Sequence, residues 1–191
     1  FAVSSIAVTL GQVHSVSMSM AASDRFALRT TKSSTLFSFG TQSDLLSGNS
    51  ITVTLPANFF SGKPQPAGQL SGSGSVPNVT CNMTAAAWSV VCVTSGATLS
   101  AGSYNLTFAA GELTTGVAVA ANSSGLAIKT SVEHESFAVS SIAVTLGQVH
   151  SVSMSMAASD RSAPKATTSS TLFSYGTQSD LLSGNSITVT L

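Results

Sequence analysis

Two cysteines carry the most reactive side chains of this sequence, and their spacing predicts a disulfide. Cys81 and Cys92 enclose the segment CNMTAAAWSVVC, whose alternating apolar residues predict two strands that turn near Ala86. If these strands pair as a hairpin, Cys81 lies opposite Cys92 on the same face, about 5 Å away, which suits a disulfide. The alternative is a pair of free buried thiols in a reducing compartment.

Four Asn-x-Ser/Thr motifs add a second chemistry, N-linked glycosylation. They begin at Asn78, Asn82, Asn105 and Asn122. The strand pattern places the first three opposite the apolar residues, and Asn122 falls in the turn-like sequence AANSSG. We therefore expect all four to face solvent and accept covalent glycans, the alternative being ordinary polar residues on a solvated face. Together with a disulfide, these motifs predict an extracellular protein, either secreted or part of a cell-surface appendage.

No pattern in the sequence predicts catalysis or a metal site. In Glu133-His134-Glu135, strand alternation would put His134 on the face opposite both carboxylates, so we expect a solvated junction between repeats rather than chelation. Asp24 and Asp44 lie in turn-like sequences and are expected to accept turn hydrogen bonds. The serines lack a Gly-x-Ser-x-Gly elbow with a usable His and Asp. We expect no enzyme activity, no metal and no cofactor.

The polar surface is built from hydroxyl groups rather than charges. The 191 residues include 59 Ser and Thr, but only 7 Lys and Arg and 7 Asp and Glu, for a net charge of zero. Charged residues make up 7%, against roughly a quarter in an ordinary domain. So few cations exclude a protein that tracks nucleic-acid phosphates. No apolar run approaches the roughly 18 residues of a membrane-spanning helix, so no membrane span is expected.

The strongest pattern is an internal repeat. Residues 137–191 repeat residues 1–55 with a period of 136 residues and six differences. A period of that length is a domain rather than one turn of a solenoid. We therefore expect a complete repeat at 1–136 and the first part of a second, near-identical repeat at 137–191. The differing pairs are Phe26/Ser162, Leu28/Pro164, Arg29/Lys165, Thr30/Ala166, Lys32/Thr168 and Phe39/Tyr175.

Apolar and hydroxyl residues alternate with a period of two along the whole repeat. No stretch of ten residues has helical periodicity, and the runs are short and bounded by Gly, Ser, Asn or Pro. The pattern predicts an all-β fold, an antiparallel β-sandwich with hydroxyls outward. The clearer strand candidates are 6–10, 15–20, 51–55, 79–83, 88–92 and 104–108, and the weaker ones are 36–40, 115–120 and 125–132.

The position of the domain boundary is left open by the sequence. Residues 56–77 contain four of the five prolines and read either as a long loop or as a boundary. If they are a boundary, residues 56–191 form one permuted domain and residues 1–55 belong to the preceding one. If the repeat begins at 137, residues 137–191 form an incomplete sandwich, whose open edge needs strands from another repeat or chain.

Three segments carry a resemblance to known repeats: ITVTLPANFF, VTCNMTAAAWSVVCVTSG and AGSYNLTFAAGELTTG. They resemble repeats of very large secreted proteins of aquatic microbes, and are similar in style to glycofibrils built from tandem immunoglobulin-like β-sandwich domains. The resemblance implies immunoglobulin-like domains in a scaffold or appendage without an active site. One departure is that Cys81 and Cys92 lie too close in sequence for the inter-sheet disulfide of antibody domains.

We therefore expect a structural subunit of an extracellular glycosylated fibre or filament, built from tandem β-sandwich repeats. Its partners would be neighbouring copies, which pack or exchange strands, and covalent carbohydrate. The alternative is a cell-surface adhesin or carbohydrate-binding module. Trp88, Tyr104 and Phe108 are its obvious aromatics, but all three alternate inward, which argues against an exposed platform for sugar.

Overall fold

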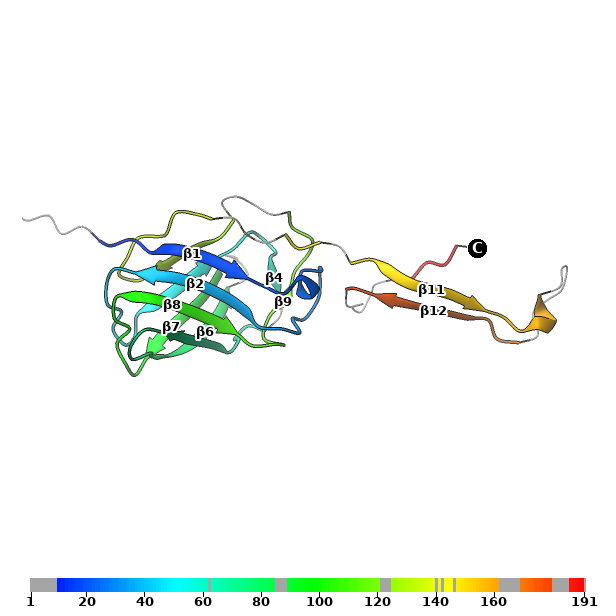
Figure 1. Cartoon of the computed structure of the whole chain (residues 1–191), viewed down its shortest axis with the longest axis horizontal. Helices are drawn as coiled ribbons and strands as arrows, with labels where there is room; N and C mark the ends of the chain where they lie inside the picture. Colours follow the sequence, from blue (N-terminus) through cyan, green and yellow to red (C-terminus); the bar gives the residue numbers. More distant parts are fainter. Residues whose placement is uncertain are drawn as a thin grey trace, which may run out of the picture.

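The protein is built from antiparallel strands, as the computed structural model shows (Figure 1). The structure describes residues 10–61, 63–84, 89–120, 125–139, 141, 143–145, 147–161, 169–179 and 186–190. These residues include two short 3-10 turns, η1 (Ala22–Asp24) and η3 (Ala158–Asp160), and no α-helix, so the all-β expectation is confirmed. The strands are β1 (His14–Ser19), β2 (Thr35–Thr41), β3 (Ser50–Thr54), β4 (Phe60–Ser61), β5 (Gly68–Gly72), β6 (Asn78–Thr84), β7 (Ser89–Ser95), β8 (Gly102–Phe108), β9 (Thr114–Thr115), β10 (Ala127–Thr130), β11 (Val149–Ser155) and β12 (Leu172–Thr177).

Two four-stranded sheets make up the body of the protein. Their strand orders are β1-β2-β8-β5 and β10-β3-β7-β6, and every neighbouring pair is antiparallel. The central pair β2–β8 joins segments far apart in the sequence, from Thr35 opposite Phe108 to Thr41 opposite Gly102. A short separate pair, β4–β9, lies beside them.

A single apolar cluster unites the inner faces of the two sheets. Phe37 and Phe108 meet edge to face with ring centroids 6.1 Å apart, a favourable geometry for aromatic rings. Because neighbouring residues of a strand point to opposite faces, the alternating pattern of the sequence fills this cluster and leaves hydroxyl groups outside. The first sheet contributes Phe37, Phe39, Leu70, Leu106 and Phe108, and the second Ile51, Val53, Cys81, Val90, Cys92 and Ile128.

Five of the clearer strand candidates of the sequence correspond to β1, β3, β6, β7 and β8, and the weaker candidates 36–40 and 125–132 correspond to β2 and β10. The expected strand at 6–10 and Trp88 lie outside the described residues, apart from Leu10. The sequence pattern misses β5, which lies inside the turn-rich segment 56–77. Leu70 is the one buried side chain of this strand, which begins and ends with glycine. The sequence GQLSG therefore shows no alternation of apolar and polar residues.

The second copy of the sequence forms the same hairpin as the first. β11–β12 reproduces the pairing of β1–β2, including the irregularity that follows His14 in one and His150 in the other, and Ser15 and Ser151 share a positive φ of 53° and 52°. Figure 1 shows this hairpin extending away from the two sheets. Its apolar residues are exposed, with Val152 at 70%. The hairpin and residues 186–190 line a pocket of about 350 Å³.

Gly116 is packed too closely for any side chain, which gives a first prediction. A Cβ atom there would lie 1.8 Å from the Asn58 carbonyl oxygen, and the Gly116 N–H donates to the Phe59 carbonyl at 2.9 Å. We expect Gly116→Ala to lower the free energy of unfolding by about 2–4 kcal/mol in urea titrations, because the backbone must shift. Gly102→Ala is the matched control, since its Cβ would meet only the Tyr104 ring at 3.4 Å or more. Equal effects of the two substitutions would contradict this packing.

Candidate functional site

The predicted disulfide is present, and it lies where the two sheets approach each other. Cys81 of β6 pairs directly with Cys92 of β7, their Cα atoms are 4.0 Å apart, and both residues are buried. On the opposite sheet, Gly68 of β5 faces the bond, because a Cβ atom on Gly68 would lie 2.6 Å from Cys81 Sγ. The disulfide therefore crosslinks two neighbouring strands of one sheet and packs against the other sheet.

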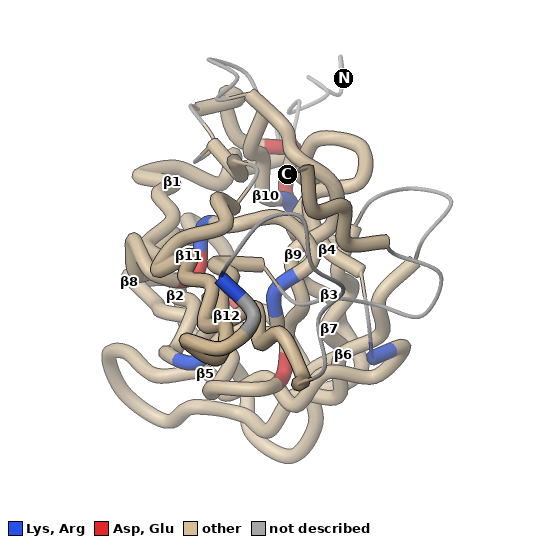
Figure 2. The backbone as a smooth tube through the Cα atoms, turned by 90° about the vertical axis from the view of Figure 1, so that its right-hand side faces the viewer, with Lys and Arg blue, Asp and Glu red and all other residues tan. Residues whose placement is uncertain are grey.

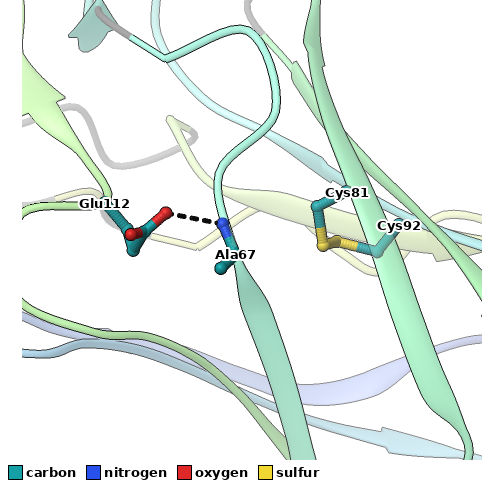
Figure 3. The surroundings of a disulfide bond; sticks show 4 residues. All are labelled: Ala67, Cys81, Cys92 and Glu112. Carbon is teal, nitrogen blue, oxygen red and sulfur yellow. Dashed lines mark hydrogen bonds between the residues drawn. A yellow bond between two sulfur atoms is a disulfide. The ribbon is translucent and has the colours of Figure 1, made fainter.

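Glu112 holds the chain entering β5, close to this disulfide (Figure 3). One carboxylate oxygen accepts a hydrogen bond from Lys63 Nζ at 2.8 Å, and the other accepts one from the Ala67 N–H at 2.7 Å. The bond from Lys63 and then the one from Ala67 lower the pKa of Glu112, because both favour the charged form. The sequence analysis did not single out this carboxylate, since its partners lie more than 40 residues away.

The sequons occupy unequal positions. Asn78 and Asn82 lie on β6, an edge strand of its sheet, and both are exposed. Asn105 lies on β8, a central strand; it is half-buried, and its side-chain oxygen accepts a hydrogen bond from Ser38 Oγ at 2.7 Å. Asn122 is outside the described residues. Two of the four expected glycosylation positions are thus freely accessible on an open strand.

Glu133 is buried, so the expectation of a fully solvated Glu-His-Glu junction is wrong. Its side chain is 5% exposed, and one oxygen accepts hydrogen bonds from the backbone N–H groups of Gln42 and Ser43 at 2.6 and 2.7 Å. The other oxygen is buried without a hydrogen-bond partner in the described part of the chain. His134 and Glu135 are exposed, as expected. The carboxylate of Glu133 caps a turn 90 residues earlier in the sequence, which no local pattern indicates.

The chain around this carboxylate runs alongside the start of the first repeat. The His134 N–H donates to the Gly11 carbonyl at 2.9 Å, and the Val13 N–H donates to the His134 carbonyl at 3.2 Å. Gln12 Nε2 also donates to the Glu135 carbonyl at 2.9 Å. The end of one 136-residue period is therefore bound to its own beginning by main-chain contacts.

The two aspartates accept turn hydrogen bonds, as expected. Asp24 is fully buried and accepts from the backbone N–H groups of Lys32 and Ser33 at 3.0 and 2.8 Å. Asp44 accepts from the Ala101 N–H at 2.7 Å. Burial, and then the negative charge of Asp44, raise the pKa of Tyr104. These groups have structural partners and are not arranged for catalysis.

An apolar pocket of about 410 Å³ lies beside the short strand β4. None of the described residues that line it is charged, so they include no acid and base pair. Its lining residues are Leu55, Pro56, Asn58, Phe60, Ser61, Pro64, Met83, Thr84, Ser89 and Val90.

Charged residues occupy scattered positions along the backbone (Figure 2). Among the described residues, no three His, Cys, Asp or Glu side chains gather closely enough to hold a metal ion. In the same part of the chain, no helix is both long and apolar enough to cross a bilayer.

Comparison with known proteins found no relative. No protein-family model matches this chain, and no significant match was found among curated proteins or solved structures.

The buried carboxylate of Glu133 supports a second prediction. Glu133→Gln replaces an acceptor of two backbone N–H groups by an amide and removes its charge, so we expect the free energy of unfolding to fall by about 2 kcal/mol. The exposed Glu135→Gln is the control for lost charge and should stay within about 0.5 kcal/mol of the parent. Urea unfolding of the three chains at neutral pH measures both values. An unchanged Glu133→Gln midpoint would show that the carboxylate does not hold this turn.

The lowered pKa of Glu112 gives a third prediction, on pH dependence. A carboxyl group whose folded-state pKa lies below its unfolded value stabilises the fold above that unfolded value. This contribution is lost as the pH falls through the folded-state pKa. Glu112→Gln should therefore be less stable than the parent at pH 7, and the difference should shrink from about pH 5 downward. Urea titrations at pH 7, 5 and 3 test this, with Glu135→Gln as the control. A difference that stays constant with pH would contradict it.

Proposed function

We propose that this chain is part of a structural subunit of an extracellular, glycosylated fibre or filament, built from tandem immunoglobulin-like β-sandwich repeats and without catalysis. Its partners are neighbouring copies of the same repeat, which pack or exchange strands, and covalent carbohydrate.

The proposal rests on one observation. The second copy of the sequence forms the same hairpin as the first, but the apolar residues of this hairpin are exposed. Phe39 of β2 is 2% exposed because β8 and the facing sheet surround it, whereas Tyr175, the matching residue of β12, is 41% exposed. Leu172 and Val149 are likewise exposed. Apolar strand faces of this kind are buried in stable proteins. Strands equivalent to β5 and β8 would complete this unit.

The arrangement of the sheets supports the β-sandwich part of the proposal. Two four-stranded antiparallel sheets share one apolar cluster, as in sandwich folds. Tyr104 donates its hydroxyl hydrogen to the Ser100 carbonyl at 2.7 Å, four residues upstream. This hydrogen bond is similar to the tyrosine corner of immunoglobulin-like domains.

The extracellular part of the proposal is supported by the disulfide and by the positions of two sequons. Disulfides persist in oxidising compartments and are rare in the cytosol. Asn78 and Asn82 are exposed on the edge strand β6. Glycans at these positions would block the open edge against unwanted strand pairing. They would also hydrate a surface that has few charges.

The alternative, a cell-surface adhesin or carbohydrate-binding module, is favoured by one feature, the 410 Å³ pocket beside β4. Its aromatic residue Phe60 is 7% exposed, and Tyr104 and Phe108 are buried, so none of the three offers a platform for stacking a sugar ring. Saturable binding of the 191-residue chain on a glycan array would favour this alternative.

Secretion of the chain from a eukaryotic host tests glycosylation, our fourth prediction. We expect an intact mass above 19.2 kDa that falls to the polypeptide mass after peptide-N-glycosidase treatment. Asn78→Gln with Asn82→Gln should lower the excess mass by two glycans, because both asparagines are exposed on β6. Antibodies against the chain should label filaments outside the native cells in electron micrographs. Unmodified secreted chains, or labelling confined to the cytosol, would overturn the proposal.

A further inference from the structure

The described residues of the segment 137–145, which we name the closing segment, complete the body formed by the preceding residues; they are 137–139, 141 and 143–145. Val139 and Leu126 exchange two backbone hydrogen bonds, of 2.8 and 3.0 Å. Val144 and Val119 exchange two more, both of 2.8 Å. Val139 and Val144 of the closing segment thus pair antiparallel with Leu126 and Val119, by hydrogen bonds typical of a strand ladder.

The end of the closing segment is also held from the opposite side. The Thr145 N–H donates to the Arg25 carbonyl at 2.9 Å, and the Ala27 N–H donates to the Thr145 carbonyl at 2.7 Å. Residues 25–27 on one side and Val119 and Leu126 on the other therefore form one acceptor site. These two parts come from near the beginning and near the end of the same 136-residue period.

Side-chain burial shows that the closing segment belongs to this core. Val144 is 2% exposed and lies in the apolar cluster, Ser141 is 4% exposed, and Val139 packs against the cluster. Phe137, at the start of the segment, is 81% exposed. A segment with this burial contributes to the stability of the residues before it, although by sequence it begins the next period.

The sequence supplies the decisive link, because residues 1–9 and 137–145 are both FAVSSIAVT. We propose that this nine-residue segment is a donated strand that closes the period before it, so that residues 1–9 fit the acceptor site of a second copy of this chain once that copy's own closing segment is disabled. The inference deepens the proposed function and rests on it for its biological meaning. Each period would then be closed by the first nine residues of the next.

This mode of pairing explains how identical units join without a separate interface. Main-chain hydrogen bonds provide the attachment, and the buried valines set the register. A contact between the front of one copy and the acceptor site of another is head-to-tail, and such contacts extend into filaments. Within one chain, the tethered closing segment fills the site at a high effective concentration, so free copies remain separate until that segment is disabled.

The test disables the tethered segment in the full 191-residue chain. Val139→Asp with Val144→Asp puts two charges where apolar side chains are buried, which empties the acceptor site but leaves residues 1–9 intact. We expect this variant to associate head to tail, with its average mass by light scattering at least doubling toward about 100 µM. The parent chain should not show this rise over the same range.

The matched control carries the same two substitutions and their equivalents in the first copy, Val3→Asp and Val8→Asp. Under the proposal this four-fold variant no longer self-associates through residues 1–9. The hairpin β11–β12 is the same in all three chains, so association through its exposed face raises all three masses equally. Equal masses for the two-fold and four-fold variants would overturn the proposal.

A peptide measurement covers the case in which the substituted chains unfold. The four-fold variant is refolded with an excess of the synthetic peptide FAVSSIAVT, or with the same peptide carrying Asp at its third and eighth positions. We expect the first peptide alone to bind and to raise the melting temperature. Failure of both peptides would reject strand donation. Unglycosylated native material without filaments would instead reject the proposed function, whatever the purified chains do.

Discussion

The apolar inner face of each sheet must be covered by the other, and the rest of the body depends on this burial. Phe37 and Phe108 from one sheet lie in the same cluster as Ile51 and Cys92 from the other. With only 7% charged residues, the protein has few ion pairs to contribute to stability. Burial of apolar area is therefore its main source of stabilisation. The disulfide and Val144 of the closing segment are part of this core.

Comparing the two copies of the repeated sequence shows which features depend on the local sequence and which depend on burial by other strands. β1–β2 and β11–β12 have the same register, the same irregularity and the same short 3-10 turn after the first strand. Arg25 and Arg161 donate to the carbonyl groups of Met20 and Met156 in the same way. Yet Val13 is 1% exposed, whereas Val149, its counterpart, is 62% exposed. The same sequence forms the same hairpin, but among the described residues only the first copy has further strands that cover it.

Much of the fold and part of the site follow from alternation alone. Strand periodicity located six of the longer strands, and the facing positions of Cys81 and Cys92 followed from one hairpin register. Strand β5 was missed because a single apolar residue between glycines carries no period. Glu133 was placed in solvent because its partners, Gln42 and Ser43, are 90 residues away and leave no local trace.

The sequence by itself determined the strands, their inward and outward faces and the hairpin that both copies form, because these depend on neighbours within a few tens of residues. Only the tertiary structure decided where the segment FAVSSIAVT is attached. Its alternating pattern predicts that one face is buried, but does not indicate which other strands cover that face. The structure places residues 137–145 against Val119 and Leu126, in the period before their own. This attachment depends on backbone N–H and carbonyl groups that come from distant parts of the chain. These groups lie side by side only after the sheets have formed.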